Sequence, residues 1–298
     1  MAALPRLETT LGVRYTYADA HIGKNYDSTL DTDLSADKQW SNWVVSGRAL
    51  YDLNDCWNLY AGVSQGFRAP NLNDLSGNLT TRSGLASLGS LDLDPEKFLS
   101  YEIGARYEMD RASLAVSAYF TDIERVIIGV PVTAGSDTLV TTNGQDGQIY
   151  GVEAEAIWDV TDRWRLSGFA SWQEGDTRSD DFSGGPVSED YISRLAPLMG
   201  SVALRWTHPD DRFWIEGRVT AAAQADKLSA RDQGDSQRIP TGGTPSYVIA
   251  SLYAGWQATE DLLVTLGLEN LTDEDYRIHG SGQNEAGINA IMGVRVRF

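Results

Sequence analysis

The sequence predicts an all-β fold, an antiparallel up-and-down transmembrane β-barrel of about 12 strands with short periplasmic turns and long extracellular loops. Three observations predict it. Apolar and polar residues alternate with a period of two in about twelve segments, whereas helical spacings are scarce. The connections between these segments are alternately short and long. The largest aromatic side chains gather beside the short connections.

Most alternating segments are about ten to fourteen residues long, which exceeds the five or six residues usual for strands of globular proteins. Such a length suits a tilted strand that crosses a bilayer. The segments lie near residues 7–19, 41–53, 56–68, 97–109, 111–123, 148–160, 162–174, 197–208, 211–224, 246–258, 261–271 and 288–298.

The connections are of two kinds. Five are short and polar, around DLNDC, EMDRA, DVTDR, HPDDR and ATED. The long ones are rich in Gly, Ser, Asp and Asn and cover residues 20–40, 69–96, 124–147, 175–195, 225–245 and 272–287. Long loops at every second connection are unusual in a compact soluble domain. Short turns on one side and long loops on the other are typical of an outer-membrane barrel.

Each predicted strand has one apolar and one charged phase. In the eighth segment the apolar phase comprises Leu198, Gly200, Val202, Leu204 and Trp206, and charged residues occur in this phase only at the ends of strands. The opposite phase holds Arg48, Glu102, Arg106, Glu153, Glu155, Arg165, Arg205, Glu216, Arg218, Glu269 and Arg295. A β-sandwich shows the same alternation with the faces reversed, so alternation alone does not choose between the two folds.

Aromatic placement favours the barrel. In the apolar phase beside the short turns lie Tyr51, Trp57, Tyr107, Trp158, Trp164, Trp206, Phe213, Trp256 and Phe298. A sandwich core gives no reason to put the largest rings at one end, whereas a bilayer interface does. We therefore expect one transmembrane barrel domain over residues 1–298.

Composition excludes several functions. The net charge of −18 argues against nucleic acid as a partner, because phosphate backbones require basic patches. Cys56 is the only cysteine, so an intrachain disulfide and a multi-cysteine metal site are excluded. The first residues, MAALPRLETT, have neither a basic nor an apolar region, so we expect no signal peptide. His208 lies in a short turn and His21 and His279 lie in long connections, so no strand interior offers a histidine as the base of an outer-membrane phospholipase. We expect no enzyme, cofactor or metal site.

Several motifs resemble a known family. In order they are SQGFRAPNLNDL (64–75), LDPEKFLSYEIGARYE (93–108), YGVEAEA (150–156), LGLENLTDEDYR (266–277) and the terminal aromatic. Together they resemble the C-terminal barrel half of TonB-dependent outer-membrane receptors. The resemblance implies a Gram-negative outer-membrane location and uptake of a scarce nutrient such as a siderophore, haem or cobalamin. The ligand would be a small molecule, including a metal chelate.

That family has a barrel of about 22 strands, a plug domain and a TonB box, and this sequence shows about 12 strands and neither of the others. The resemblance therefore implies a partial or truncated receptor, with TonB as a partner only if a plug domain is supplied. Two alternatives stay open: a standalone pore or structural barrel without a plug, and a soluble all-β binding protein.

Candidate ligand-binding residues are Arg68, which ends the third strand, and Glu153, Glu155 and Arg205, whose phase faces the lumen. The same residues also suit structural roles, as a strand end and as ion-pair ladders with Glu102 and Arg106. His279 lies in the last long loop and is the better histidine candidate for ligating haem or a chelated metal.

The terminal aromatic residue, the apolar phase and one acidic segment each suggest a further partner. Phe298 resembles the terminal signal read by the barrel-assembly machinery, so deleting it should impair membrane assembly more than ligand affinity. Outer-membrane lipid should cover the apolar phase. The acidic segment 27–37 lacks the ordered spacing of a calcium loop and suits solvated acids or loose divalent-ion bridging to lipopolysaccharide.

Overall fold

The computed structural model describes residues 6–27, 32–80, 86–133, 136, 138–144, 146–179 and 188–298. All twelve predicted strands are present; the first two are longer than predicted, and the other ten lie within a few residues of the expected positions. They are β1 (Leu7–Asp27), β2 (Thr32–Asp52), β3 (Trp57–Arg68), β6 (Glu96–Met109), β7 (Ala112–Glu124), β10 (Asp146–Asp159), β11 (Trp164–Ser179), β13 (Met199–Thr207), β14 (Phe213–Ala222), β15 (Tyr247–Gln257), β16 (Leu262–Glu269) and β17 (Asn289–Val296).

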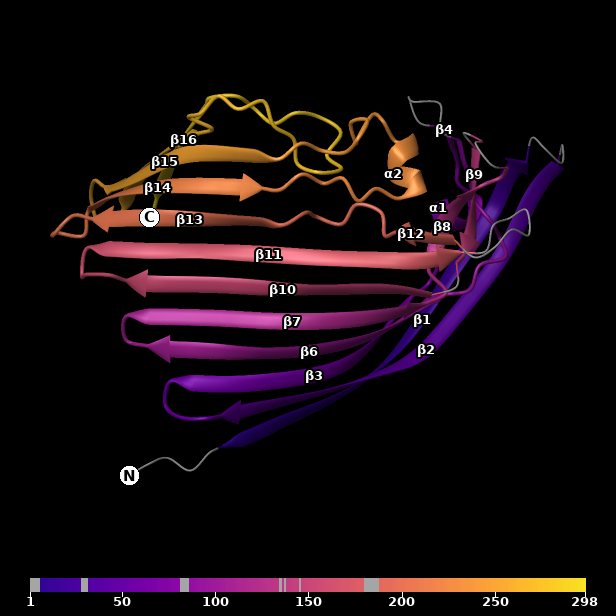
Figure 1. Ribbon diagram of the computed structural model, residues 1–298, viewed down its shortest axis with the longest axis horizontal. Helices are drawn as coiled ribbons and strands as arrows, with labels where there is room; N and C mark the ends of the chain where they lie inside the picture. The colour runs from indigo at the N-terminus through magenta and orange to yellow at the C-terminus, as the bar shows by residue number, and fades with distance from the viewer. Residues whose placement is uncertain are drawn as a thin grey trace.

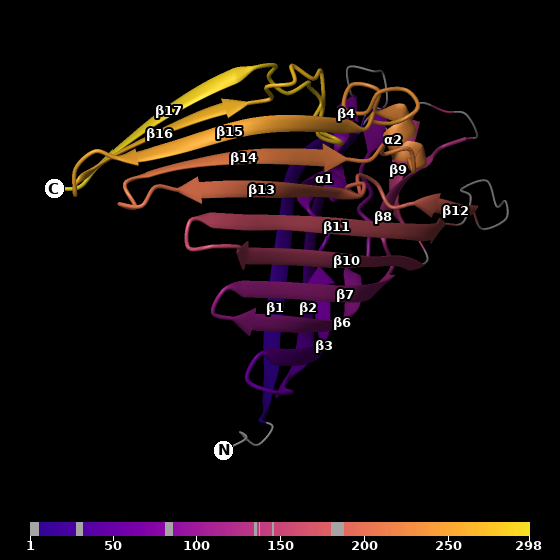
Figure 2. The same ribbon diagram turned by 60° about the vertical axis from the view of Figure 1, so that its left-hand side comes forward.

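These strands form one antiparallel meander in chain order from β1 to β17, and the short strand β12 (Ser188–Tyr191) extends it beside β11. The sheet is strongly curved, with the short turns at one end and the long loops at the other (Figures 1 and 2). Within the described residues β1 and β17 do not pair with each other, so the sheet is open. The up-and-down antiparallel topology is confirmed.

The long loops build a second layer at their own end of the sheet (Figure 1). It contains the strands β4 (Asn78–Thr80), β5 (Ala86–Leu88), β8 (Ile127–Pro131) and β9 (Thr138–Asn143), which pair in the order β4-β5-β9-β8. It also contains the helices α1 (Leu72–Ser76) and α2 (Ala230–Gly234). No helix in the described part of the chain is long and apolar enough to span a membrane.

The prediction of a loop over residues 20–40 is wrong, because β1 and β2 continue as a paired hairpin to Asp27 and from Thr32. The extension has an apolar anchor. Ile22, only 7% exposed, packs with Leu75 of α1 and with Leu93, and Trp40 packs against this cluster. Burial of these side chains holds the hairpin against the first long loop.

The acidic segment in this hairpin is described only in part. Asp31 lies outside the described residues, as do the side chains of Asp27 and Asp33. The Asp37 carboxylate lies 2.5 Å from His21 Nδ1 across the hairpin.

Strand register aligns the apolar phases of all twelve strands on one face. Gly168, Val202, Val219 and Ala250 are successive cross-strand partners on this face. Val202 is 57% exposed within the chain and Met292 is 70% exposed, as expected for side chains that face lipid. Aromatic pairs lie beside the short turns, with Trp57 5.0 Å from Tyr107 and Trp206 6.4 Å from Phe213 between ring centroids.

The opposite, charged phase is called here the polar face. Aromatic rings on this face lie over glycines of the next strand, a pattern that sequence analysis missed. An added Cβ at Gly104 would lie 2.3 Å from the Tyr60 ring, and one at Gly255 would lie 2.3 Å from Trp214 Nε1. Glycine is required here by space, because the ring occupies the volume of a side chain.

Candidate functional site

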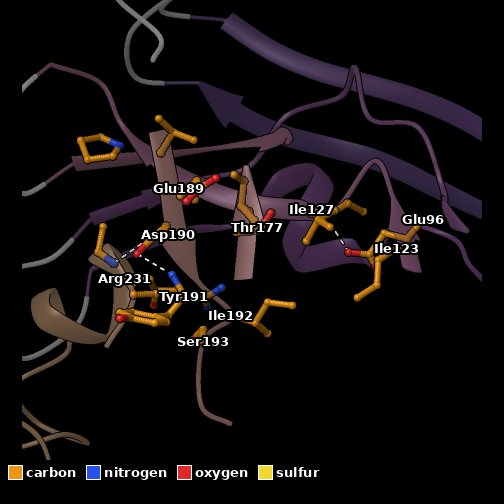
Figure 3. Close-up of a pocket in the computed structure, with 17 residues that line it drawn as sticks. Glu96, Ile123, Ile127, Thr177, Glu189, Asp190, Tyr191, Ile192, Ser193 and Arg231 are labelled. Carbon is orange, nitrogen blue, oxygen red and sulfur yellow. Dashed lines mark hydrogen bonds between the residues drawn. The ribbon is translucent and has the colours of Figure 1, made fainter. Parts of the chain in front are cut away.

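The long loops enclose two adjoining cavities over the polar face. The larger, about 580 Å³, has Glu96, Ile123 and Thr177 in its floor, from polar-face positions of β6, β7 and β11. Its walls come from β8, from the segment 189–193 and from the start of α2. Figure 3 shows Glu189, Asp190 and Tyr191 on one side of this cavity and Glu96, Ile123 and Ile127 on the other.

The smaller cavity, about 370 Å³, lies between α1, β8, β9 and α2. Three arginines line it, Arg194, Arg231 and Arg238. Ile127, Ile128, Gly129 and Arg231 line both cavities, so the two spaces meet at β8 and at α2.

Arg68 anchors the loops to the sheet. Its Nε donates to Glu96 Oε2, and its Nη1 donates to Asp74 Oδ2 at 3.0 Å. Glu96 is 5% exposed, and its second oxygen accepts the Ile127 N–H at 2.7 Å. Arg68 thus connects β3 to α1, β6 and β8, and its guanidinium is committed to structure in this arrangement.

Both short helices begin with reciprocal capping. The Asn71 side chain accepts the Asp74 N–H, and the Ser229 side chain accepts the Asp232 N–H. Asp232 is 2% exposed and also joins another loop, because it accepts the Ser193 hydroxyl at 2.6 Å and the Arg194 N–H at 3.2 Å. One carboxylate therefore starts α2 and fixes the segment after β12.

A buried carboxylate holds two of the three cavity arginines. Asp235 is 3% exposed, and its Oδ2 accepts Arg194 Nη2 and Arg238 Nη1, each at 2.9 Å. Two guanidiniums thus share one carboxylate, which leaves one of their positive charges without a neutralising partner in this group. Separating Asp235 from these two arginines would leave the buried carboxylate without compensating charge, so the three side chains hold one another in place.

His279 lies at the same loop junction. Its Nδ1 is 2.8 Å from Thr244 Oγ1. Burial lowers the pKa of His279; Asp232 opposes this effect and Arg194 adds to it. The structure places His279 beside the loop 225–245, and its role as a ligand to haem or a chelated metal stays a prediction.

The other predicted site residues lie on the sheet. Arg205 pairs with Glu216 at 2.8 Å, and Arg48 lies 3.7 Å from Glu102, as expected of ion-pair ladders. Glu153 and Glu155 are exposed on the polar face and form no ion pair within the described residues, so the ladder prediction is wrong for this pair.

Arg106 lies over the Tyr60 ring, 5.1 Å from its centroid. Phe298 is fully exposed beside the short turn at Asp261, whose carbonyl accepts the Arg297 N–H at 2.9 Å. The proposed assembly signal is thus at the opposite end from the cavities.

The residues that shape the cavities were not predicted from the sequence. Arg194 lies in an irregular segment, and Arg231 and Asp235 lie in or directly after the five-residue helix α2, so no periodicity indicates which side chains meet. The only available signal was the spacing of Asn71 with Asp74 and of Ser229 with Asp232, which is that of a helix-capping box.

A curved antiparallel meander that is apolar on one face, polar on the other and covered at one end by long loops is the wall of a transmembrane β-barrel. Residues 2–271 match the family model described as TonB dependent receptor-like, beta-barrel. The chain belongs to this family, and it is an outer-membrane protein of the Gram-negative type.

Individual proteins similar to this chain are consistent with the family assignment. The chain is 27% identical to the vitamin B12 transporter BtuB of Vibrio vulnificus over 94% of its own length and 45% of the relative. It is also 27% identical to the pesticin receptor of Yersinia enterocolitica, over 90% of its length and 37% of the receptor. The chain thus spans less than half the length of these relatives.

Solved structures share the fold. The copper transporter OprC superposes with a TM-score of 0.79 at 22% identity, covering 98% of this chain and 46% of OprC. The FrpB iron transporter from Neisseria meningitidis superposes with a TM-score of 0.74 at 16% identity, over 98% of this chain and 43% of FrpB.

Proposed function

We propose that this chain forms the C-terminal portion of the barrel of a receptor that binds a scarce nutrient outside the cell and passes it inward. The observation that carries the proposal is the pair of adjoining cavities, which the long loops enclose directly over the polar face. Binding sites are typically concave, largely apolar and supplied with a few placed polar groups. The ligand would be a small molecule such as a siderophore, haem or cobalamin, and the role would be transport without catalysis.

The polar face would line the inward path. Glu216 is 5% exposed and joins Arg205 and Arg218, and Tyr253 donates to Glu269 Oε1 at 3.1 Å. These groups are already paired, so they would guide a ligand without trapping it. Glu153 and Glu155 have no ion-pair partner in the part of the chain that the structure describes, and they are the better candidates for contact with a passing ligand or a plug domain.

Energy coupling would require TonB, and TonB would act only where a plug domain is supplied. The other proposed partners are outer-membrane lipid, which would contact the apolar face, lipopolysaccharide and the barrel-assembly machinery.

Uptake by a Gram-negative reporter strain that lacks its own nutrient receptors tests the proposal. Growth on one member of a panel of ferric siderophores, haem and cobalamin should require this chain, expressed together with a plug domain, and should stop when the inner membrane is uncoupled. A variant that cuts the loop anchor, Arg68→Ala, should lose uptake. Arg125→Ala is the control, because it removes only a loop ion pair with Asp94.

The alternative without a plug predicts a different result. A passive pore would give steady single-channel conductance in a planar bilayer and would admit small solutes in uncoupled cells. That result, together with no energised uptake of any panel member, would contradict the receptor proposal.

A further inference from the structure

Arg231 stands where the two cavities meet. It lines both spaces, and within the described residues its guanidinium forms no ion pair or hydrogen bond. A free guanidinium is notable in a chain whose net charge is −18. It has five N–H donors and suits bidentate binding of an oxyanion.

The larger cavity offers mainly apolar surface to a ligand. Its buried polar groups are already bonded: Glu96 to Arg68 and the Ile127 N–H, and Asp190 to two backbone N–H groups, those of Tyr191 and Ala230. Glu189, another acid in this lining, lies 3.7 Å from Arg178. The apolar side chains that can contact a ligand include Ile123, Val126, Ile128, Val130, Pro131 and Ile192. A flat hydrocarbon or aromatic group would bind favourably here, because its apolar surface would leave water for an apolar cavity wall.

The smaller cavity adds positive charge. Arg194 and Arg238 share the single carboxylate of Asp235, and Arg231 brings a further unpaired charge to the same lining. Asp74, the other acid in this lining, is already bonded to Arg68. The smaller cavity therefore attracts anions, and a cation placed there would meet like charge.

We propose that the two cavities together bind one amphiphilic organic carboxylate. Its apolar body lies in the larger cavity against Ile128, and its carboxylate binds Arg231 at the boundary with the smaller one. This inference rests on the proposed function and names the substrate class of that same vestibule. A neutral ligand would leave the arginines without an anionic partner, and an inorganic anion would make no contact with the apolar wall of the larger cavity.

The test uses the whole chain in lipid nanodiscs with 2-naphthoate as the probe, read by calorimetry or saturation-transfer NMR. The comparators are 2-naphthylmethylammonium, with the same body and opposite charge, and sulfate, with charge and no body. Naphthoate should bind more tightly than either.

Two variants test the two parts of the site. Arg231→Gln should weaken naphthoate about tenfold, the loss of one charge-assisted hydrogen bond, and Arg231→Lys should recover part of it. Ile128→Asn should weaken naphthoate, and Ile128→Leu should not. The matched control Arg277→Gln removes the same charge at a loop residue that lines neither cavity and bonds Asn284. Unchanged heat-modifiable mobility shows that each variant is folded.

Equal affinity of the naphthoate and ammonium probes, or equal weakening by Arg231→Gln and Arg277→Gln, would overturn this inference. Neither result would affect energised uptake in the reporter strain, so the receptor proposal would stand or fall separately. If naphthoate fails to bind the unmodified chain, the carboxylate assignment is wrong, whatever nutrient the strain takes up.

Discussion

The sheet and the loop layer of this protein are held together in different ways. In the sheet, a side chain's role follows from its phase, because Val202 meets Gly168 and Val219 on neighbouring strands and all face lipid. In the loop layer, single buried carboxylates join segments that are distant in sequence. Glu96 lies 28 residues from Arg68, and Asp235 lies 41 residues from Arg194.

The difference determines how each region responds to change. On its lipid face the sheet tolerates replacement of a large apolar side chain by a smaller one, since lipid fills the space that is left. The loop layer depends on particular donors and acceptors, because a buried polar group without a partner is costly. A charged side chain placed on the lipid face should therefore destabilise the sheet most, and loss of one buried hydrogen-bond acceptor should destabilise the loop layer most.

The largest effect is expected from a charge on the lipid face. Val202→Arg should lower the free energy of unfolding by about 2–4 kcal/mol, the range for arginine at mid-bilayer. Its neighbour Ser201 lies on the polar face, so Ser201→Arg should change stability by less than about 1 kcal/mol. Denaturant unfolding in lipid vesicles measures both. Equal losses would mean that the two faces are not distinct.

A smaller, local effect is expected from Asp232→Ala. It removes the acceptor of the Ser193 hydroxyl and of the Arg194 N–H and should destabilise the loop 225–245 by about 2 kcal/mol. Hydrogen exchange of that loop measures the change. Asp226→Ala, an exposed acid in the same loop, is the control and should stay within about 0.5 kcal/mol. Exchange that rises throughout the sheet would contradict the view that the two regions are separate.

The smallest effect is expected from pH at His279. Because burial lowers its pKa below 6.5, the folded loop binds fewer protons than the unfolded loop in mild acid. The stability of the loop 272–287 is therefore greatest above pH 6.5, and it decreases as the pH falls through 6.5 toward the lowered pKa. Limited proteolysis of this loop at neutral and mildly acidic pH should show the loss, and His279→Gln should reduce it.

His208→Gln serves as the control for the pH experiment, because His208 lies in a short turn with Asp210. It should keep the pH dependence of the loop. An identical pH response in His279→Gln and the unmodified chain would exclude His279 as the cause.

Most of the sheet was predictable from sequence. Alternation placed each strand, and phase placed Trp57, Trp206 and Phe213 beside the short turns on the apolar face. The prediction failed for residues 20–40, where polar composition indicated a loop. There Ile22 and Trp40 extend the hairpin by packing against Leu75 and Leu93, residues of another connection.

The candidate site was predictable only in part. The pairing of Arg205 was expected from the charged phase, but its partner Glu216 was not specified. Arg68 was identified and turned out to be held by Glu96 and Asp74. Arg231 was not identified, since nothing in its local sequence distinguishes a free arginine from a paired one.

The sequence by itself determined the strands, their two faces, the short and long connections and the family. It could do so because a strand repeats every two residues, so each short window carries its own orientation. Only the tertiary structure decided which loop residues meet, which glycines lie under Tyr60 and Trp214, and which arginine is left free at the cavities. Those outcomes depend on contacts between segments far apart in the chain, and such contacts leave no periodic pattern within any one of them.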